Sequence, residues 1–224
     1  ERKVSVGTFF KRYKDNLIEW KSSTTTTTAF ALNLGFNFPS MPSLQLSYSP
    51  YSQRNNDPDP DLMIDNTTSL FSAMAGFSYL LGDLNSSTSV TFSLQSSTTA
   101  DGLADYRTNS FMISDAVSLQ IPLTFTGSLG LIQTDSPLGD SRINNVDLGA
   151  SAVIFEKWQN AAGVNVTSEK DRNRRVGFYL NSTLTLLKGL EFNLRAEHAR
   201  YTDRLSSTES YKELVFRSTL TGSW

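Results

Sequence analysis

An alternation of apolar and polar residues runs through the chain and constrains its fold more than any other feature. Between residues 29 and 38, for example, Phe30, Leu32 and Leu34 are separated by Ala31 and Asn33. Successive side chains of a β-strand point to opposite faces, so this segment has one apolar face and one polar face. The pattern recurs between turn-forming residues and predicts twelve strands. These cover residues 4–14, 26–38, 43–52, 67–81, 86–98, 107–122, 125–135, 144–156, 160–170, 174–187, 190–203 and 209–224.

The composition indicates what the two faces contact. No stretch of the 224 residues approaches the roughly 18 to 20 consecutive apolar residues that a membrane-spanning helix needs. Charged residues make up only 19%, and the polar face carries mainly Ser, Thr, Asn, Gln and Gly. A soluble β-sandwich is the alternative, but its exposed face would carry more Lys and Glu. The pattern favours an all-β fold, a closed antiparallel up-and-down transmembrane β-barrel of about 12 strands.

The predicted connections are of two kinds that alternate along the chain. Outer-membrane barrels likewise alternate short periplasmic turns with longer extracellular loops. Because the strand number is even, both termini are expected on the tight-turn side, which would be periplasmic. We expect residues 1–224 to form a single barrel domain, either alone or as the C-terminal part of a longer chain. Tight turns are predicted near 39–42, 82–85, 123–125, 157–159 and 188–189, and longer loops near 15–25, 53–66, 99–106, 136–143, 171–173 and 204–208.

Aromatic residues flank both kinds of connection. Two such bands are typical of the aromatic girdles that lie at the two lipid–water interfaces. Phe38, Tyr79, Phe125, Trp158, Phe192 and Trp224 lie beside tight turns, and Tyr51, Phe71, Phe111, Tyr201 and Tyr211 lie beside longer loops.

The end of the chain carries a more specific signal. Phe216, Leu220 and Trp224 fall on one face of the last predicted strand, with Ser218 and Gly222 as weaker members of the same row. This ending resembles the C-terminal strand of Gram-negative outer-membrane proteins. The resemblance implies a place in the bacterial outer membrane, contact with outer-membrane lipid, and recognition of the strand by the barrel assembly machinery during insertion.

Charged residues gather on the polar face of the last two predicted strands. Buried opposite charges must be paired or hydrated. They predict either a lumen-lining salt-bridge network that stiffens the barrel or the polar lining of a narrow pore for small solutes. Both signs occur together, so no strong ion selectivity is expected. The residues are Glu191, Arg195, Glu197, Glu213 and Arg217.

Asp115 interrupts the apolar face of its strand, where Ile113 and Val117 are its neighbours. A carboxylate that faces lipid is costly. The sequence leaves three explanations open: a β-bulge turns Asp115 inward, the residue lies at the membrane interface, or it contacts a partner protein. The last would make the chain a structural or partner-binding subunit of an envelope complex.

A third hypothesis, an outer-membrane lipid hydrolase, depends on His198, the only histidine. Such an enzyme needs a serine within reach of the imidazole. The neighbours Ala196 and Arg200 do not supply one, and Ser182 and Ser210 are the remaining candidates. We therefore expect a protein that is not an enzyme.

Cofactors and nucleic acid are not expected. The chain has no cysteine and a formal net charge of -2, so it offers no thiolate metal site and no basic surface suited to nucleic acid. The acidic loop with Asp57, Asp59 and Asp61 lacks the Gly and Glu that an EF-hand needs, and no metal is predicted there. A basic loop edge at residues 172–175 could contact anionic lipid headgroups.

Overall fold

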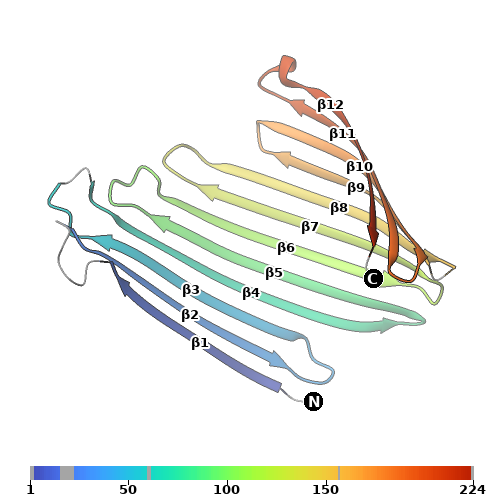
Figure 1. The fold of residues 1–224 in the computed structure, drawn as a ribbon, viewed down its shortest axis with the longest axis horizontal. Coiled ribbons are helices and arrows are strands. Elements are labelled where there is room, and N and C mark those ends of the chain that lie inside the picture. Colours follow the sequence, from blue (N-terminus) through green and yellow to red (C-terminus); the bar gives the residue numbers. More distant parts are fainter. Residues whose placement is uncertain (1–2, 16–22, 60–61, 156, 223–224) are drawn as a thin grey trace. The chain divides into compact units, whose positions relative to one another are not determined.

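The computed structural model describes residues 3–15, 23–59, 62–155 and 157–222. They form one twelve-stranded sheet in which the strand order follows the sequence, so that each strand pairs with the next (Figure 1). The strands that have a described pairing are antiparallel throughout. The all-β, twelve-stranded antiparallel fold expected from the alternation is confirmed.

The strand bounds agree with the predicted ones to within a few residues. A short 3-10 helix, η2, was not predicted and lies in the last long loop. The elements are β1 (Lys3–Lys14), β2 (Thr25–Asn37), β3 (Ser43–Asn55), β4 (Asp65–Leu81), β5 (Leu84–Thr98), β6 (Tyr106–Ser118), β7 (Leu123–Asp135), β8 (Ser141–Ile154), β9 (Trp158–Glu169), β10 (Asn173–Leu187), β11 (Leu190–Asp203), η2 (Ser207–Glu209) and β12 (Tyr211–Gly222).

The largest error concerns the turn between β6 and β7. The alternation of Leu119 and Ile121 extended the predicted strand to residue 122, but β6 ends at Ser118. Pro122 has no backbone N–H to donate to a ladder. Instead, the N–H of Leu123 donates to the carbonyl of Ile121 at 2.6 Å, and the N–H of Leu119 donates to that of Leu123. The turn therefore lies at 119–122 and not at 123–125.

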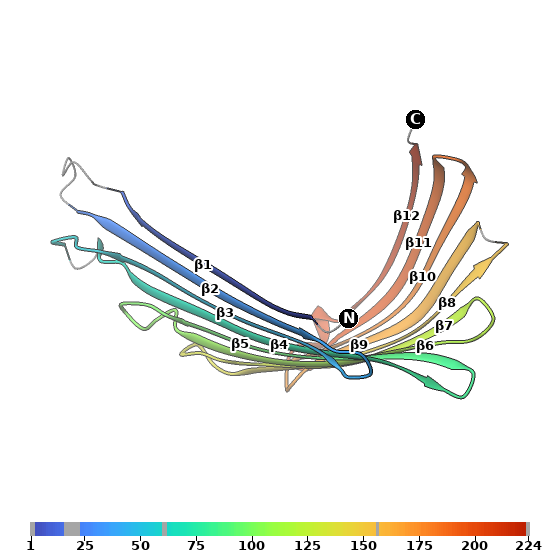
Figure 2. The ribbon, with the colours of Figure 1, turned by 90° about the horizontal axis from the view of Figure 1, so that it is seen from below.

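The chain divides into two compact units. The first comprises Glu1–Phe77, Val90–Phe111 and Ile132–Ser141. In this unit β1, β2 and β3 lie side by side (Figure 2). The register places the apolar Val6 opposite Leu34 and the small Ser5 opposite Gly35.

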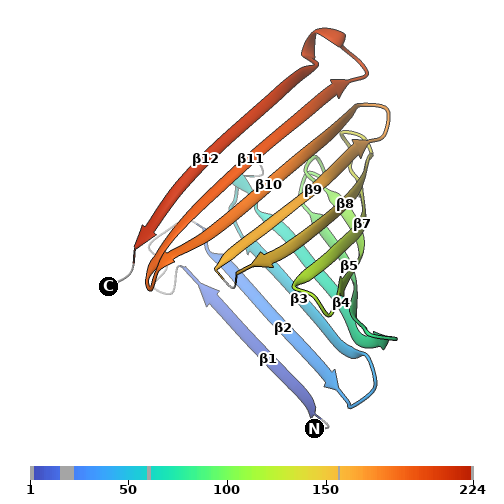
Figure 3. The same ribbon diagram turned by 90° about the vertical axis from the view of Figure 1, so that its right-hand side faces the viewer.

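The second unit comprises Ser78–Ser89, Met112–Leu131 and Arg142–Trp224. It contains the ladder from β8 to β12, in which the connections at 170–172 and 204–210 lie at one end and the turn at 188–189 lies at the other (Figure 3). Within these five strands, apart from the end of β10 after Thr185, the odd-numbered residues share the polar face, for example Asp147, Asn165 and Glu197. The even-numbered residues share the apolar face.

No second layer covers the apolar face in the part of the chain that the structure describes. The only helix there is the three-residue η2, and all strands belong to a single sheet. Ala199 is the only buried apolar residue among the described ones, whereas Phe178, Leu214 and Phe216 are more than half exposed. A β-sandwich needs two packed sheets, so the soluble alternative does not fit this architecture. None of the described helices is long and apolar enough to cross a membrane.

Two glycines allow a tyrosine to lie flat across the polar face. The Tyr179 ring extends from β10 over Gly163 of β9, and its hydroxyl reaches Gly149 of β8. A Cβ built on Gly163 would meet the Tyr179 ring and lie 2.5 Å from the backbone carbonyl oxygen of Leu148. Because a carbonyl cannot move aside as a flexible side chain can, this position requires glycine.

Replacing Gly163 by alanine is therefore expected to destabilise the sheet by about 1–3 kcal/mol, the usual range for overpacking. Gly127→Ala is the matched control, because the nearest atom to its new Cβ is a Leu148 methyl carbon at an ordinary 3.4 Å. Urea unfolding of the protein in lipid vesicles, followed by tryptophan fluorescence, measures both. Equal stability of the two variants would contradict the close approach.

Candidate functional site

The polar face of β8 to β11 carries a hollow of about 400 Å³ lined almost wholly by charged or amide side chains. All of the lining residues belong to the second unit and come from alternate positions of four neighbouring strands. They are Asp147, Asn165, Arg175, Tyr179, Asn181, Arg195 and Glu197.

Glu197 is the centre of this charge cluster. One carboxylate oxygen accepts a hydrogen bond from Arg175 of β10, and the other accepts one from Arg195 at 3.0 Å. The Glu197 side chain is 17% exposed, whereas the Arg195 side chain is 56% exposed. One carboxylate therefore holds two guanidinium groups, and the exposed Arg195 remains accessible to solutes.

A second polar network lies beside this cluster. The Tyr179 hydroxyl donates to Asp147 at 3.4 Å, and Asn145 accepts from both Asn165 and Thr167. The two bonds to Asn145 join β9 to β8, and the bond from Tyr179 joins β10 to β8. The polar face is thus cross-linked by side chains as well as by the backbone ladder.

The five residues predicted to line a lumen fall on this same polar face. Glu191 lies opposite Thr221, Glu213 opposite Ala199, and Arg217 opposite Arg195. The structure brings Arg195 and Glu197 together as an ion pair. No ion pair among the described residues includes Glu191, Glu213 or Arg217.

Arg175, Asp147 and Tyr179 were missed as members of the site. Alternation alone assigns all three to the polar face, so the signal was present in the sequence. Their convergence depends on the β8–β9–β10 register, which places Tyr179 opposite Gly163 and Gly163 opposite Gly149. Periodicity does not determine such a register.

The first unit carries a hollow of a different kind on its polar face. It has a volume of about 560 Å³, and none of its lining residues is charged. Its polar side chains belong to Ser5, Asn33, Gln45, Ser47, Ser72 and Thr91, and the hydroxyls of Ser47 and Ser72 are hydrogen-bonded at 2.7 Å. This surface suits water and uncharged polar solutes.

Asp115 keeps its place on the apolar face and is satisfied there by hydroxyl groups. Its carboxylate accepts hydrogen bonds from Thr88 at 2.7 Å and from Ser86 at 3.1 Å. The preceding residue, Ser114, bonds Ser89 on the opposite face at 2.7 Å. Regular alternation between residues 114 and 115 argues against a bulge that turns Asp115 inward. Ser86 is 5% exposed, so the contact is sheltered.

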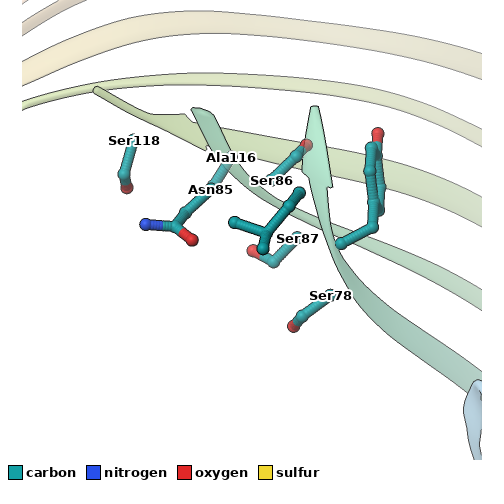
Figure 4. Close-up of a pocket in the computed structure, with 8 residues that line it drawn as sticks. Ser78, Asn85, Ser86, Ser87, Ala116 and Ser118 are labelled. Atoms are coloured by element: carbon teal, nitrogen blue, oxygen red, sulfur yellow. The ribbon is translucent and has the colours of Figure 1, made fainter. Parts of the chain in front are cut away.

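A hollow of about 270 Å³ lies at the tight-turn end of β4, β5 and β6, on the polar face and so on the side of the sheet opposite Asp115 (Figure 4). Small side chains line most of it, whereas the Ser86 side chain points to the other face, where it bonds Asp115 (Figure 4). The labelled residues are Ser78, Asn85, Ser86, Ser87, Ala116 and Ser118.

The surroundings of His198 do not form a catalytic site. Its cross-strand partners are Phe178 and Leu214. Of the two candidate serines, Ser182 donates to Asn160 at 2.9 Å, and Ser210 accepts from the N–H of Asp203 at 3.0 Å. Neither hydroxyl is bonded to the imidazole, so the geometry gives the hydrolase hypothesis no support.

The other sequence-predicted residues are placed as follows. Phe216 and Leu220 lie on the apolar face of β12, opposite Ala196 and Phe192, and Trp224 lies outside the described residues. Asp57 caps the N–H of Asp59 at 3.0 Å, while Asp61 is also outside them. Among the described residues, no group of three or more potential metal ligands occurs.

The girdle assignment is wrong for three of the aromatic residues. Tyr201 lies opposite Tyr211 on the polar face, where the two rings stack with centroids 5.0 Å apart. Tyr51 lies opposite Ala29, which belongs to the polar face of β2. Near strand ends the hydrophobic period weakens, and proximity to a loop did not reveal which face a ring occupies.

The fold is similar to that of outer-membrane β-barrels of known structure. An anion-selective porin from Comamonas acidovorans matches with a TM-score of 0.53 and 11% identity, over 99% of this chain and 98% of that chain. CdiB from Acinetobacter baumannii matches with a TM-score of 0.51 and 10% identity, over 100% of this chain and 51% of that chain. At such identities the likeness shows the fold alone.

No family model and no curated protein matches the sequence. The fold predicted from the alternation is nevertheless confirmed by the solved barrels.

Replacing Asp115 tests whether its hydroxyl contacts stabilise the sheet. Asp115→Ala removes the carboxylate that accepts from Thr88 and leaves the sheltered Ser86 hydroxyl without its acceptor, so it is expected to cost about 1–3 kcal/mol, the usual penalty for an unsatisfied sheltered group. Asp115→Asn retains an acceptor oxygen and is expected to cost less. Urea unfolding in vesicles measures both, with Asp83→Ala in an exposed turn as the control. A wild-type midpoint for Asp115→Ala would show that the contacts contribute nothing.

Proposed function

We propose that this chain is an outer-membrane β-barrel that acts as a narrow pore for small polar solutes. The observation that carries the proposal is the contrast between the two faces of the sheet, one polar and charged and the other apolar. One face has a 400 Å³ hollow lined by Asp147, Arg175, Arg195 and Glu197, and the other is an uncovered apolar face. A single sheet of this kind suits a wall between lipid and water.

The number of strands supports a narrow lumen. Eight strands leave an interior that side chains fill, and sixteen to eighteen leave a wide aqueous channel. Twelve strands fall between these cases. Side chains such as Tyr179, which extends over two glycines, would reduce the open cross-section further.

The charges on the polar face favour passage of small solutes over strong selection of one ion sign. Positive and negative groups are interspersed on β8 to β12, and Glu197 partly neutralises the two arginines beside it. The polar residues in the first unit are uncharged where they line its hollow. Weak selectivity is the expected result.

The bacterial outer membrane is the proposed location, with both termini periplasmic. The even number of strands supports termini on one side, and the tight turns support assignment of that side to the periplasm. Recognition of β12 by the barrel assembly machinery belongs to the same proposal, supported by Phe216 and Leu220 on its apolar face.

Conductance of the purified protein in a planar lipid bilayer tests the pore. We expect discrete steps with weak ion selectivity. Glu197→Gln removes the carboxylate between Arg175 and Arg195 and is expected to raise the anion-to-cation permeability ratio, measured from reversal potentials in a salt gradient. Asp83→Asn removes the same charge from a turn and should leave the ratio unchanged. An intact barrel that never conducts would overturn the pore.

A second candidate function is that of a partner-binding barrel in an envelope complex. The polar patch of Ser86, Thr88 and Asp115 on an otherwise apolar face favours it, because a protein can complement such a patch and an acyl chain cannot. Purification from native membranes, with Asp115→Asn beside wild type, tests this role. A stoichiometric protein lost only in the variant supports it, and identical preparations without a partner refute it.

A further inference from the structure

The long-loop end of the second unit has a surface that the pore does not explain. Arg142, Arg174, Arg200 and Lys212, called here the basic edge, all occupy even positions of β8, β10, β11 and β12. They therefore share the apolar face with residues such as Phe178. All four are exposed.

Carboxylates are segregated from the basic edge. Every Asp and Glu in the described strands β8 to β12 occupies an odd position and so belongs to the polar face. They are Asp147, Glu169, Glu191, Glu197, Asp203 and Glu213. Within the described part of the chain, no ion pair includes any member of the basic edge.

Two members of the basic edge face each other directly. Arg200 and Lys212 are cross-strand partners in the β11–β12 ladder, and Arg174 is diagonal to Arg200 because Arg200 lies opposite Val176. Directly opposite residues are about 5 Å apart at Cβ and diagonal ones about 7–8 Å, and like charges directly opposite are destabilising. An anion between them would remove that repulsion.

The polar face of the same ladder provides a contrast. Arg195 is likewise opposite another arginine, Arg217, but Glu197 binds Arg195 at 3.0 Å. The protein supplies its own counter-charge where like charges meet on the polar face. On the apolar face it supplies none, which leaves that place for an external anion.

We infer that the basic edge binds the phosphate of anionic lipid headgroups. The occupant must join an anion to apolar chains, because the apolar surface of Phe178 and Leu214 continues directly from the basic residues. A membrane lipid has both parts. Arginine binds phosphate oxygens with two parallel hydrogen bonds, and long cationic side chains reach from an apolar surface to the headgroup layer. Ser168 and Thr202, the cross-strand partners of Arg174, add hydroxyl donors.

This inference rests on the proposed membrane location but not on pore activity, so the conductance experiment and the lipid experiment fail separately. The full chain is inserted in bilayers with a tryptophan reporter, Phe178→Trp, on the apolar face. Residue 178 is two residues from Val176, which lies opposite Arg200 of the basic edge. Quenching by brominated phosphatidylglycerol is compared with quenching by brominated phosphatidylcholine that has the same chains. The parent protein without the reporter gives the background.

The anionic lipid is expected to quench the reporter at lower mole fraction than the neutral lipid. Arg200→Gln with Lys212→Gln should reduce this preference by about fivefold to thirtyfold, the effect of losing one or two charged contacts at a membrane surface. Lys157→Gln with Lys188→Gln removes two charges beside the tight turns and should leave the preference unchanged. Arg200→Lys with Lys212→Arg should retain it.

Several results would overturn the inference. One is equal quenching of the wild-type reporter by the two lipids. Another is the same preference for the anionic lipid in the glutamine variant as in wild type. A third is loss of the preference in 10-fold excess inorganic phosphate over lipid, which would make free phosphate the ligand. A membrane protein that copurifies with wild type but not with the glutamine variant, without any lipid preference, would assign the basic edge to a protein partner. If the glutamine variant fails to insert, the salt dependence of the wild-type preference decides, because a charge contact weakens as salt rises.

Discussion

The backbone ladder is the constraint on which the rest of this structure depends. The described strands form a single sheet with one polar and one apolar face, and no described element packs over the apolar face. In lipid, an unpaired N–H or carbonyl has no water to bond, so each strand is stable only through its neighbours. Hydroxyl pairs such as Ser47–Ser72 and Ser93–Ser110 add side-chain bonds to the ladder on the polar face. Burial in a core, which stabilises most folds, contributes little here.

A single layer also changes what a charged residue needs. Glu197 has Arg175 and Arg195 as partners because all three project from one face of neighbouring strands. Asp115 projects from the other face, where serine and threonine hydroxyls satisfy it. The two faces of the sheet therefore form separate electrostatic environments, although only the thickness of the backbone lies between them. The separation explains how the basic edge and the carboxylates of the polar face share the same strands without pairing.

The sequence predicted the periodic part of the structure and little of what depends on register. Strand number and the face of Glu191 or Arg217 follow from alternation alone. The turn at 119–122 was missed because Leu119 and Ile121 continue the hydrophobic period, although Pro122 cannot continue the ladder. The bonds of Arg175 with Glu197 and of Asp115 with Thr88 depend on which residues lie opposite each other. The register is set by the lengths of the turns, and errors of a few residues in the predicted strand ends hide those lengths.

In the β10–β11 hairpin the pairing shifts between Thr185 and Leu187. Without a bulge to absorb it, one extra residue would exchange inside for outside in everything that follows on a strand, and here the turn at 188–189 follows almost at once. The same insertion in the middle of β10 would act like a frameshift in a gene. The residues downstream would keep their identity and order, but their polar side chains would face lipid and their apolar side chains would face water. Such a wall can change length freely in its loops, whereas its strands can grow by two residues at a time, or by one only where a β-bulge absorbs the extra residue.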